Sequence, residues 1–272
     1  GDIGPDTDWR SALKDAKVVI HAAARTHVIN ESLEDSEQAY RRVNLEATTA
    51  LAAQAIESGV KKFIFLSSVK VGGESSIFGK PLSLEMLPAP EDHYGTTKLA
   101  AEAALFRLAR EKQMEVVILR TPLIYGPGVK GNMLSLFNAV NKGMFLPLKW
   151  IDNKRDFIYV HNFVDAIMRT IKFQAKAPNI YYVCDGESVS TVELIKRISS
   201  ALDEPVRLYP LPISILKIMG WVSGYSSAVK KLTGTLQVDG SKFCRDADWT
   251  PPFSMKEGLA STAAWYKSQS GL

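Results

Sequence analysis

The sequence contains only two cysteines and no uninterrupted apolar run long enough to cross a bilayer. Cys184 and Cys244 stand far apart in neither a metal-ligand nor a redox spacing, which favours reduced thiols in a cytoplasmic protein and indicates no metal site. The longest apolar stretch, residues 213–222, is broken by Lys217 and is shorter than the roughly 20 residues of a membrane helix. We therefore expect this stretch to pack against the body of the protein, with contact to a membrane surface as the lesser alternative.

The chain also lacks a concentration of charge. Its formal net charge is +4, and its lysines and arginines are dispersed rather than gathered in a stripe with interleaved aromatic residues. This distribution gives no support to nucleic-acid binding. A length of 272 residues with 46% hydrophobic composition allows a large core in one or two domains.

One strand and one helix carry the residues that suggest chemistry. Residues 63–66 are apolar and β-prone and are followed by two serines, which predicts a buried parallel strand with Ser68 at its carboxyl end. Ligands bind at that end in open α/β sheets. A helix predicted over residues 94–112 begins at Tyr94, and the i, i+4 spacing places Tyr94 and Lys98 on one face.

These three side chains suit removal of a proton from a sugar or alcohol hydroxyl during hydride transfer. A free tyrosine has a pKa of about 10, so forming phenolate near neutral pH costs roughly 4 kcal/mol. An ammonium about 4 Å away supplies a comparable Coulomb energy at an effective dielectric constant of about 20. We expect Tyr94 to be the general base, Lys98 its electrostatic tuner and ribose anchor, and Ser68 the hydrogen-bond partner of the reacting oxygen. A Tyr-x-x-x-Lys spacing alone is most often a solvated helix face, so the interpretation depends on the serine-ended strand upstream.

Two further segments are candidates for cofactor contact. Residues 17–24 form a β-branched run that ends in three alanines, and small residues at a strand end let a flat ligand approach the backbone. Ordinary packing of a helix on the sheet explains these alanines equally well. Asn44 lies on a helix predicted over residues 35–58, where it either braces the strand that bears Ser68 or faces solvent.

The order of elements predicts the fold class. Strands at residues 17–24, 63–68 and 115–120 alternate with the helices at residues 35–58 and 94–112, which implies a parallel sheet with right-handed crossovers. After residue 131 we expect shorter pieces: helices near 132–141, 163–173, 191–202 and 254–267, and strands at 157–160 and 180–183.

With these residues in place, the chain resembles the extended short-chain dehydrogenase/reductase family, in particular its nucleotide-sugar epimerases and reductases. The family's strand-end serine, five residues before a glycine, falls on Ser68, and its Tyr-x-x-x-Lys pair falls on Tyr94 and Lys98. Its Arg-Asp-(Tyr/Phe)-Ile-x-Val segment falls on residues 155–160. Further matches lie at His21, Ala22, Ala23, Ala24, Asn44, Gly73, Pro122, residues 125–128, Trp249, Pro251, Gly258 and Trp265.

The resemblance implies a cofactor and a substrate. NAD is expected, with NADP left open, at Asp2, Ile3, Ala22, Ala23, Ala24, Asn44, Tyr94, Lys98 and Pro122. A UDP-sugar is expected at Ser68, Lys70, Tyr94, Asn132 and Arg155. Arg155 is similar to an arginine that holds the UDP diphosphate, and a guanidinium suits that task because it pairs with phosphate oxygens in a fork.

One departure concerns the start of the chain. The family's Gly-x-x-Gly-x-x-Gly loop has no match in this sequence, and Asp2-Ile3 instead resembles the adenine contact that follows the family's third strand. We therefore expect an α/β protein with a truncated Rossmann-like parallel sheet, starting on the order of 60 residues into the half-fold. Residues 1–130 would form the partial dinucleotide-binding domain, and residues 131–272 mainly a substrate-binding cap with some segments returning to the sheet.

Several activities share this set of residues. The family's 4,6-dehydratases carry Thr-Asp-Glu where this chain has Ser68-Val69-Lys70, so dehydration is disfavoured, and Arg155 favours a nucleotide sugar over a steroid. The leading expectation is an NAD-dependent 4-epimerase of UDP-glucose and UDP-galactose or their N-acetyl analogues. A UDP-4-keto-sugar reductase of surface polysaccharide synthesis is the alternative, and an inactive dinucleotide-sensing relative is the alternative of another class. Lys70 departs from the epimerase pattern and is expected either to face solvent or to contact a substrate substituent.

Family members often form homodimers through two long helices. These correspond here to residues 35–58 and 94–112, whose alanine-rich faces allow close packing. Contact of the same faces with the sheet explains the alanines equally well.

Overall fold

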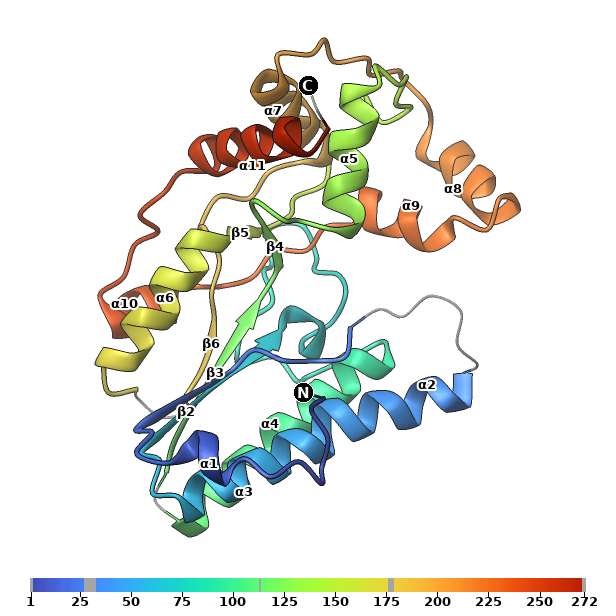
Figure 1. Cartoon of the computed structure of the whole chain (residues 1–272). Coiled ribbons are helices and arrows are strands. Elements are labelled where there is room, and N and C mark those ends of the chain that lie inside the picture. Colours follow the sequence, from blue (N-terminus) through green and yellow to red (C-terminus); the bar gives the residue numbers. More distant parts are fainter. Residues whose placement is uncertain (1, 27–32, 113, 176–178, 271–272) are drawn as a thin grey trace.

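The computed structural model describes residues 2–26, 33–112, 114–175 and 179–270, and it has a four-stranded parallel sheet at its centre (Figure 1). The strand order is β1 (Val18–His21), β2 (Lys62–Ser68), β3 (Glu115–Thr121) and β6 (Ile180–Tyr182). A second, two-stranded parallel sheet consists of β4 (Leu123–Tyr125) and β5 (Phe157–Tyr159). The prediction of a parallel α/β sheet is confirmed.

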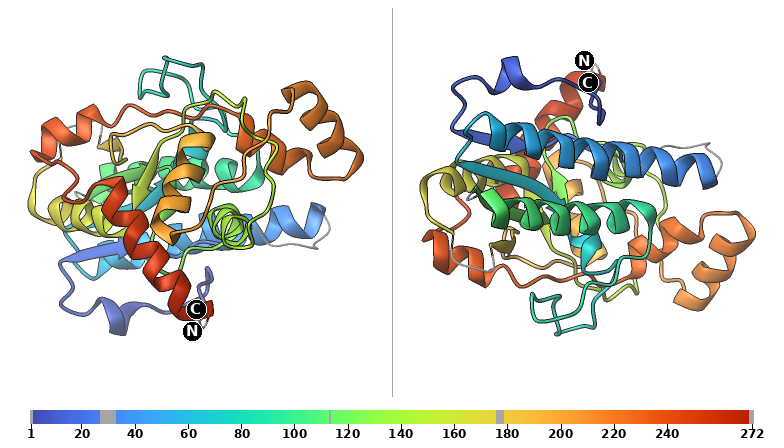
Figure 2. Two further views of the ribbon diagram at one scale, coloured as in Figure 1. Left: turned by 90° about the horizontal axis from the view of Figure 1, so that it is seen from above. Right: turned by 90° about the horizontal axis from the view of Figure 1, so that it is seen from below.

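Both faces of the four-stranded sheet are covered, as its apolar strands require. In β2, Phe63 and Phe65 point to one layer and Ile64 to the other, because side chains alternate along a strand. The first layer contains α1 (Arg10–Leu13), α2 (Leu33–Tyr40), the π-helical η1 (Arg41–Ala47), α3 (Thr48–Glu57) and α4 (His93–Lys112). The opposite layer contains α6 (Val160–Lys172) and α10 (Ser241–Ala247). Figure 2 shows α3 and α4 running side by side on the first face.

The remaining helices form a second region above the carboxyl ends of the strands (Figure 1). Its helices are α5 (Gly131–Asn141), α7 (Thr191–Leu202), α8 (Ile213–Val222), α9 (Ser226–Thr233) and α11 (Met255–Ser270). A core that includes Phe137, Ile195 and Leu259 joins α5, α7 and α11. The other two, α8 and α9, pack on each other.

Most predicted elements are present with shifted ends. The helix predicted over residues 35–58 is a continuous run of α2, η1 and α3 within the described residues, and the strand predicted over residues 17–24 ends at His21. Among the described elements, β4, α8, α9 and α10 were not predicted.

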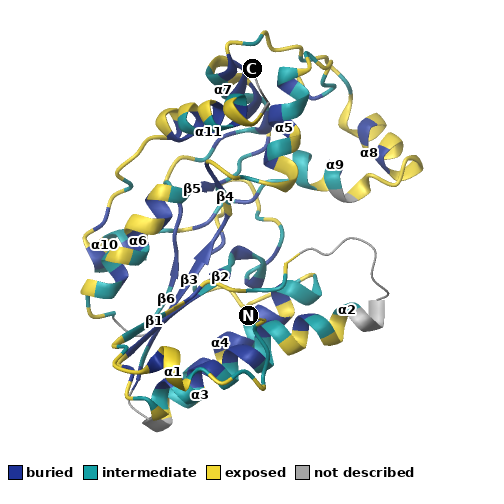
Figure 3. Cartoon of the chain, in the orientation of Figure 1, coloured by how far each residue is buried: buried dark blue, intermediate teal, exposed yellow. Residues whose placement is uncertain are grey.

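The prediction that residues 213–222 pack against the body is wrong for most of that helix. Only Leu216 and Gly220 of α8 are buried, and Figure 3 shows most of the helix as exposed. Among the described residues, no helix combines the length and apolarity needed to cross a membrane.

Candidate active site

Ser68 stands where β2 ends and a short turn begins. The 3-10 turn η2 (Val69–Val71) follows immediately, and the Ser68 hydroxyl oxygen accepts a hydrogen bond from the Lys70 backbone N–H at 3.2 Å. In register, Ser68 lies opposite Thr121 of β3. The serine is therefore held at the carboxyl end of the sheet, as its position in the sequence predicts.

The start of α4 is pressed against this turn. Asp92 accepts a hydrogen bond from the Gly95 N–H at 2.7 Å, which satisfies one of the unpaired amides of the first helical turn. A Cβ at Gly95 would lie 2.8 Å from the Lys70 carbonyl oxygen, so a larger residue would push the helix away. This close approach brings Tyr94 near Ser68, whose hydroxyl lowers the pKa of the phenol.

Burial raises the pKa of Tyr94 above its ordinary value. The nearby Lys70 charge and the Ser68 hydroxyl oppose this effect because both favour the phenolate, whereas Asp92 adds to it. The Lys70 ammonium lies 6.0 Å from the centre of the Tyr94 ring, and the Tyr40 ring meets the Tyr94 ring edge-on at 6.5 Å. Without further positive charge the phenol stays protonated at neutral pH.

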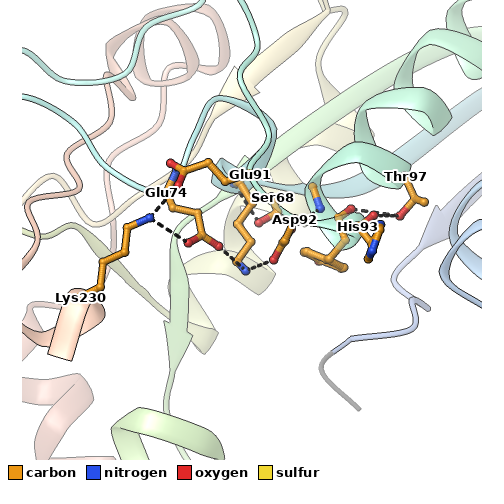
Figure 4. Close-up of polar contacts among 10 residues, drawn as sticks. Ser68, Glu74, Glu91, Asp92, His93, Thr97 and Lys230 are labelled. Carbon is orange, nitrogen blue, oxygen red and sulfur yellow. Dashed lines mark hydrogen bonds and ion pairs between the residues drawn. The ribbon is translucent and has the colours of Figure 1, made fainter. Parts of the chain in front are cut away.

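Lys70 belongs to a network of ion pairs whose other members, Glu74, Glu91, Asp92 and Lys230, are labelled in Figure 4. Its ammonium contacts Glu74 at 2.8 Å and also Asp92, and its side chain is only 18% exposed. Lys230 of α9 extends the network to Glu91 at 2.7 Å and to Glu74 at 3.9 Å. The two expectations for Lys70 can be separated: the side chain does not face bulk solvent, and it is fixed beside the phenol.

Lys98 lies one helical turn further along α4 and is 1% exposed. Its ammonium donates a hydrogen bond to the Leu66 carbonyl oxygen at 2.6 Å and lies 3.8 Å from the centre of the Phe65 ring. Burial lowers the pKa of Lys98 to about 7, and the Glu102 carboxylate opposes that change. Ser68, Tyr94 and Lys98 are thus grouped around the end of β2.

Asn44 joins two parts of the predicted cofactor site. The Asn44 side chain is 1% exposed. Its oxygen accepts a hydrogen bond from the Arg25 backbone N–H at 2.8 Å. Its NH2 group donates to the Arg25 carbonyl at 3.1 Å and to the Thr97 hydroxyl at 3.3 Å. Asn44 therefore neither faces solvent nor bonds the Ser68 strand. It fastens the loop after β1 to the helix that carries Tyr94, from within a π-helical stretch of a kind often found at functional sites.

The other predicted cofactor residues surround the same end of the sheet. Ala22 and Ala23 are exposed and Ala24 is half-buried directly after β1, and Pro122 is buried between β3 and β4. The segment of Asp2 and Ile3 is followed by Asp6, which pairs with Arg42 of η1 at 3.0 Å. Donor groups on Tyr94 and Lys98 beside an alanine-lined strand end fit the ribose and nicotinamide half of a dinucleotide.

The predicted substrate residues Arg155 and Asn132 lie on different elements. Arg155 is half-buried, and its Nη1 donates to the carbonyls of Lys231 and Gly234 at 3.0 Å each, at the end of α9. Burial lowers the Arg155 pKa, and the Glu74 carboxylate opposes this, which connects Arg155 electrostatically to the network around Lys70. Asn132 is exposed on the first turn of α5.

A buried ion pair beneath the site was missed by the sequence analysis. Glu102 of α4 and Arg120 of β3 form two hydrogen bonds, at 2.6 and 3.1 Å, and the Ser67 hydroxyl donates to the same carboxylate at 2.5 Å. Both charged side chains are at most 6% exposed. The Glu102 position, four residues after Lys98 on α4, was the available signal, since it places a carboxylate on the inward face of the helix.

Comparisons with known proteins identify the family of the chain. The profile of the NAD dependent epimerase/dehydratase family matches residues 1–184. A UDP-glucose 4-epimerase of Vibrio cholerae is 45% identical over 97% of this chain and 80% of its own length. An N-acetyl-alpha-D-glucosaminyl-diphospho-ditrans,octacis-undecaprenol 4-epimerase of Escherichia coli O157:H7 is 28% identical over 96% of this chain and 81% of its own.

A comparison with solved structures supports the fold. The structure of a UDP-glucuronic acid 4-epimerase from Bacillus cereus in complex with NAD matches with a TM-score of 0.79 at 22% identity, over 99% of this chain and 80% of that one. The resemblance stated from the motifs and the expectation of a nicotinamide cofactor are confirmed. On the profile match and the 45% identity together, the chain belongs to the NAD-dependent epimerase/dehydratase family.

Proposed function

We propose that this protein is an NAD-dependent 4-epimerase of UDP-sugars, acting on UDP-glucose and UDP-galactose or their N-acetyl analogues. The observation that supports this most directly is that Ser68 and Tyr94 meet at the carboxyl end of β2, with the ammonium groups of Lys70 and Lys98 close by. The 45% identity to a UDP-glucose 4-epimerase supports the substrate class.

In this proposal Tyr94 takes the proton of the sugar 4-hydroxyl and later returns it to the same oxygen. Ser68 holds that oxygen while C4 passes through the carbonyl state. A bound NAD would take up the hydride from C4 and return it to the opposite face. In the same proposal the ammonium of Lys98 donates to a ribose hydroxyl of the bound cofactor and favours the phenolate.

The substrate diphosphate is assigned to Arg155. Its Nη1 is anchored on two backbone carbonyls, which fixes the plane of the guanidinium and leaves the rest of the fork to bind phosphate oxygens. Asn132 and Lys70 are further candidates for contacts with the nucleotide and the sugar. We propose that residues 1–130 bind mainly the dinucleotide and residues 131–272 mainly the substrate, although β5 and β6 belong to the sheets.

Replacing Tyr94 by Phe tests the general-base assignment. Turnover of UDP-galactose to UDP-glucose by the full-length protein should fall by a factor of about 10² to 10⁴, the usual contribution of a positioned acid or base. Tyr40→Phe is the matched control, because this ring contacts Tyr94 without a part in the proposed chemistry. Equal turnover of Tyr94→Phe and the parent would remove the assignment, and absence of turnover in the parent would favour the inactive relative.

One observation favours a second candidate, the UDP-4-keto-sugar reductase. The raised pKa of Tyr94 keeps the phenol protonated, which is the state that delivers a proton to a 4-keto oxygen. An epimerase interconverts UDP-sugars with no net consumption of nicotinamide. Stoichiometric loss of added NADH or NADPH on a UDP-4-keto sugar, without epimerisation of UDP-galactose, would instead establish the reductase.

We also propose a homodimer formed by the helices at residues 35–58 and 94–112. Ala103 on the outer side of α4 is exposed and small, which allows a second helix to approach closely. Light scattering on the eluting protein tests this: the parent should have twice the mass of Ala103→Arg, and equal monomer masses would exclude the dimer.

A further inference from the structure

The outward face of α8 is apolar, which is the reverse of an ordinary surface helix. Ile218, Trp221 and Val222 are 61%, 78% and 75% exposed, whereas Leu216 and Gly220 on the opposite side are buried. A helix on the surface of a globular protein normally turns polar residues to water. The apolarity of this face therefore needs an explanation other than the core.

A second exposed apolar group lies on the segments paired just before α8 in the chain. Residues 144–150 are hydrogen-bonded to residues 207–209, with Leu146 paired to Leu208, and α8 begins just beyond that segment. The exposed side chains here are Met144, Phe145, Trp150 and Tyr209, which are 51% to 60% exposed. Together with the outward residues of α8 they form what we call the α8 platform.

The segments that carry the α8 platform contain only basic charges, although Asp152 and Glu204 flank them and Lys230 is paired with Glu91 and Glu74. Residues 127–151 and 205–238 contain no aspartate or glutamate. They contain seven basic residues: Lys130, Lys142, Lys149, Arg207, Lys217, Lys230 and Lys231. Lys217 is exposed on α8 itself, and the Arg207 guanidinium lies 5.3 Å from the centre of the Phe145 ring. The surface offers apolar and aromatic side chains among cations, and it is complementary to an anionic, apolar partner.

We propose that the α8 platform docks this protein on the surface of a bilayer that contains anionic phospholipid. Tryptophan and tyrosine prefer the interface between headgroups and acyl chains, and lysine and arginine are drawn to anionic headgroups. Helix α8 has ten residues, which is about 15 Å of helix, so it lies in the interface and does not cross it. This inference does not depend on the proposed activity, and each can fail without the other.

Sedimentation with lipid vesicles tests the proposal on the full-length protein. The parent should sediment with vesicles of phosphatidylglycerol and phosphatidylcholine, and about tenfold less with phosphatidylcholine alone or at high salt. Replacing Ile218 and Val222 together by Glu should reduce the bound fraction by about tenfold. The matched control replaces Ile77 and Leu87 by Glu, because these apolar side chains are equally exposed but lie outside the platform. Equal loss in the control, or a parent that never sediments, would overturn the proposal.

Two further measurements keep the test decisive. Quenching of the parent's tryptophan fluorescence by brominated lipid requires no variant; it should occur if Trp150 and Trp221 enter the interface, and its absence would contradict docking. The second measurement is the oligomeric state. If the parent does not bind vesicles but forms a dimer, and the double variant Ile218→Glu with Val222→Glu is a monomer, then a second copy of the chain covers the platform. That result would also overturn the proposal.

Discussion

Lys70 offers the sharpest test of how the site works. Its ammonium lies 6.0 Å from the centre of the Tyr94 ring, and its charge lowers the pKa of the phenol. At that separation and an effective dielectric constant of about 20, the attraction to a phenolate is about 3 kcal/mol, or roughly a hundredfold in the ionisation equilibrium. Asp92 and Glu74 offset part of this. We therefore expect Lys70→Met to slow epimerisation at neutral pH by a factor between about 10 and 100.

The pH profile separates this role from a structural one. If Tyr94 acts as a base, kcat/KM rises with pH as the phenol ionises. Loss of the Lys70 charge raises the Tyr94 pKa, so the rising limb should move to higher pH in Lys70→Met and return toward the parent position in Lys70→Arg. Lys80→Met, an exposed change in the same loop, is the control. A uniform loss of rate at every pH, with the limb unmoved, would refute the electrostatic reasoning.

Three further results follow from the buried groups. Glu102→Gln leaves the Arg120 guanidinium buried without its carboxylate partner, so the free energy of unfolding measured in denaturant titrations should fall by about 3 to 5 kcal/mol. Replacing both Glu102 and Arg120 by Met should restore most of that stability. Burial, with a smaller effect of Lys98, lowers the pKa of His21 to about 4. Because the unfolded chain takes up this proton at higher pH, the free energy of unfolding should fall by up to about 3 kcal/mol between pH 6.5 and pH 4. His21→Gln should flatten that dependence on pH. Arg155→Lys loses the fork and should raise KM for the UDP-sugar about tenfold or more with little change in kcat, whereas a fall in kcat alone would contradict the diphosphate assignment.

The central sheet and the Ser68, Tyr94 and Lys98 cluster could be predicted because each depends on a short-range signal. Apolar β-branched runs fix the strands, and a parallel sheet puts their carboxyl ends on one edge. The i, i+4 spacing then fixes which helical side chains face that edge. None of these steps requires knowledge of the side chains that approach from distant parts of the chain.

The electrostatic partners could not be predicted in the same way. Lys98 was predicted as the tuner of Tyr94, but the second ammonium, Lys70, whose charge lowers the phenol's pKa, was not. The placement of Lys70 depends on a close backbone approach at Gly95 and on a cap at Asp92, both of which are tertiary features. The hydropathy of residues 213–222 likewise shows that the segment is apolar. It does not show which of these side chains pack against the rest of the protein.

The α8 platform and the site are connected through α9. Gly220 of α8 packs so closely on Val229 of α9 that an added Cβ would lie 2.6 Å from its methyl group, and the far end of α9 supplies the carbonyls that hold Arg155. Lys230 of the same helix joins the ion pairs around Lys70. A displacement of α8 could therefore pass through α9 to Arg155, the proposed diphosphate ligand, and to Lys70. If docking on lipid repositions α9, the KM of the parent for the UDP-sugar should change when anionic vesicles are added. The KM of the double variant Ile218→Glu with Val222→Glu should stay constant. An identical KM of the parent with and without vesicles would show that docking brings the enzyme to the membrane surface without changing its site.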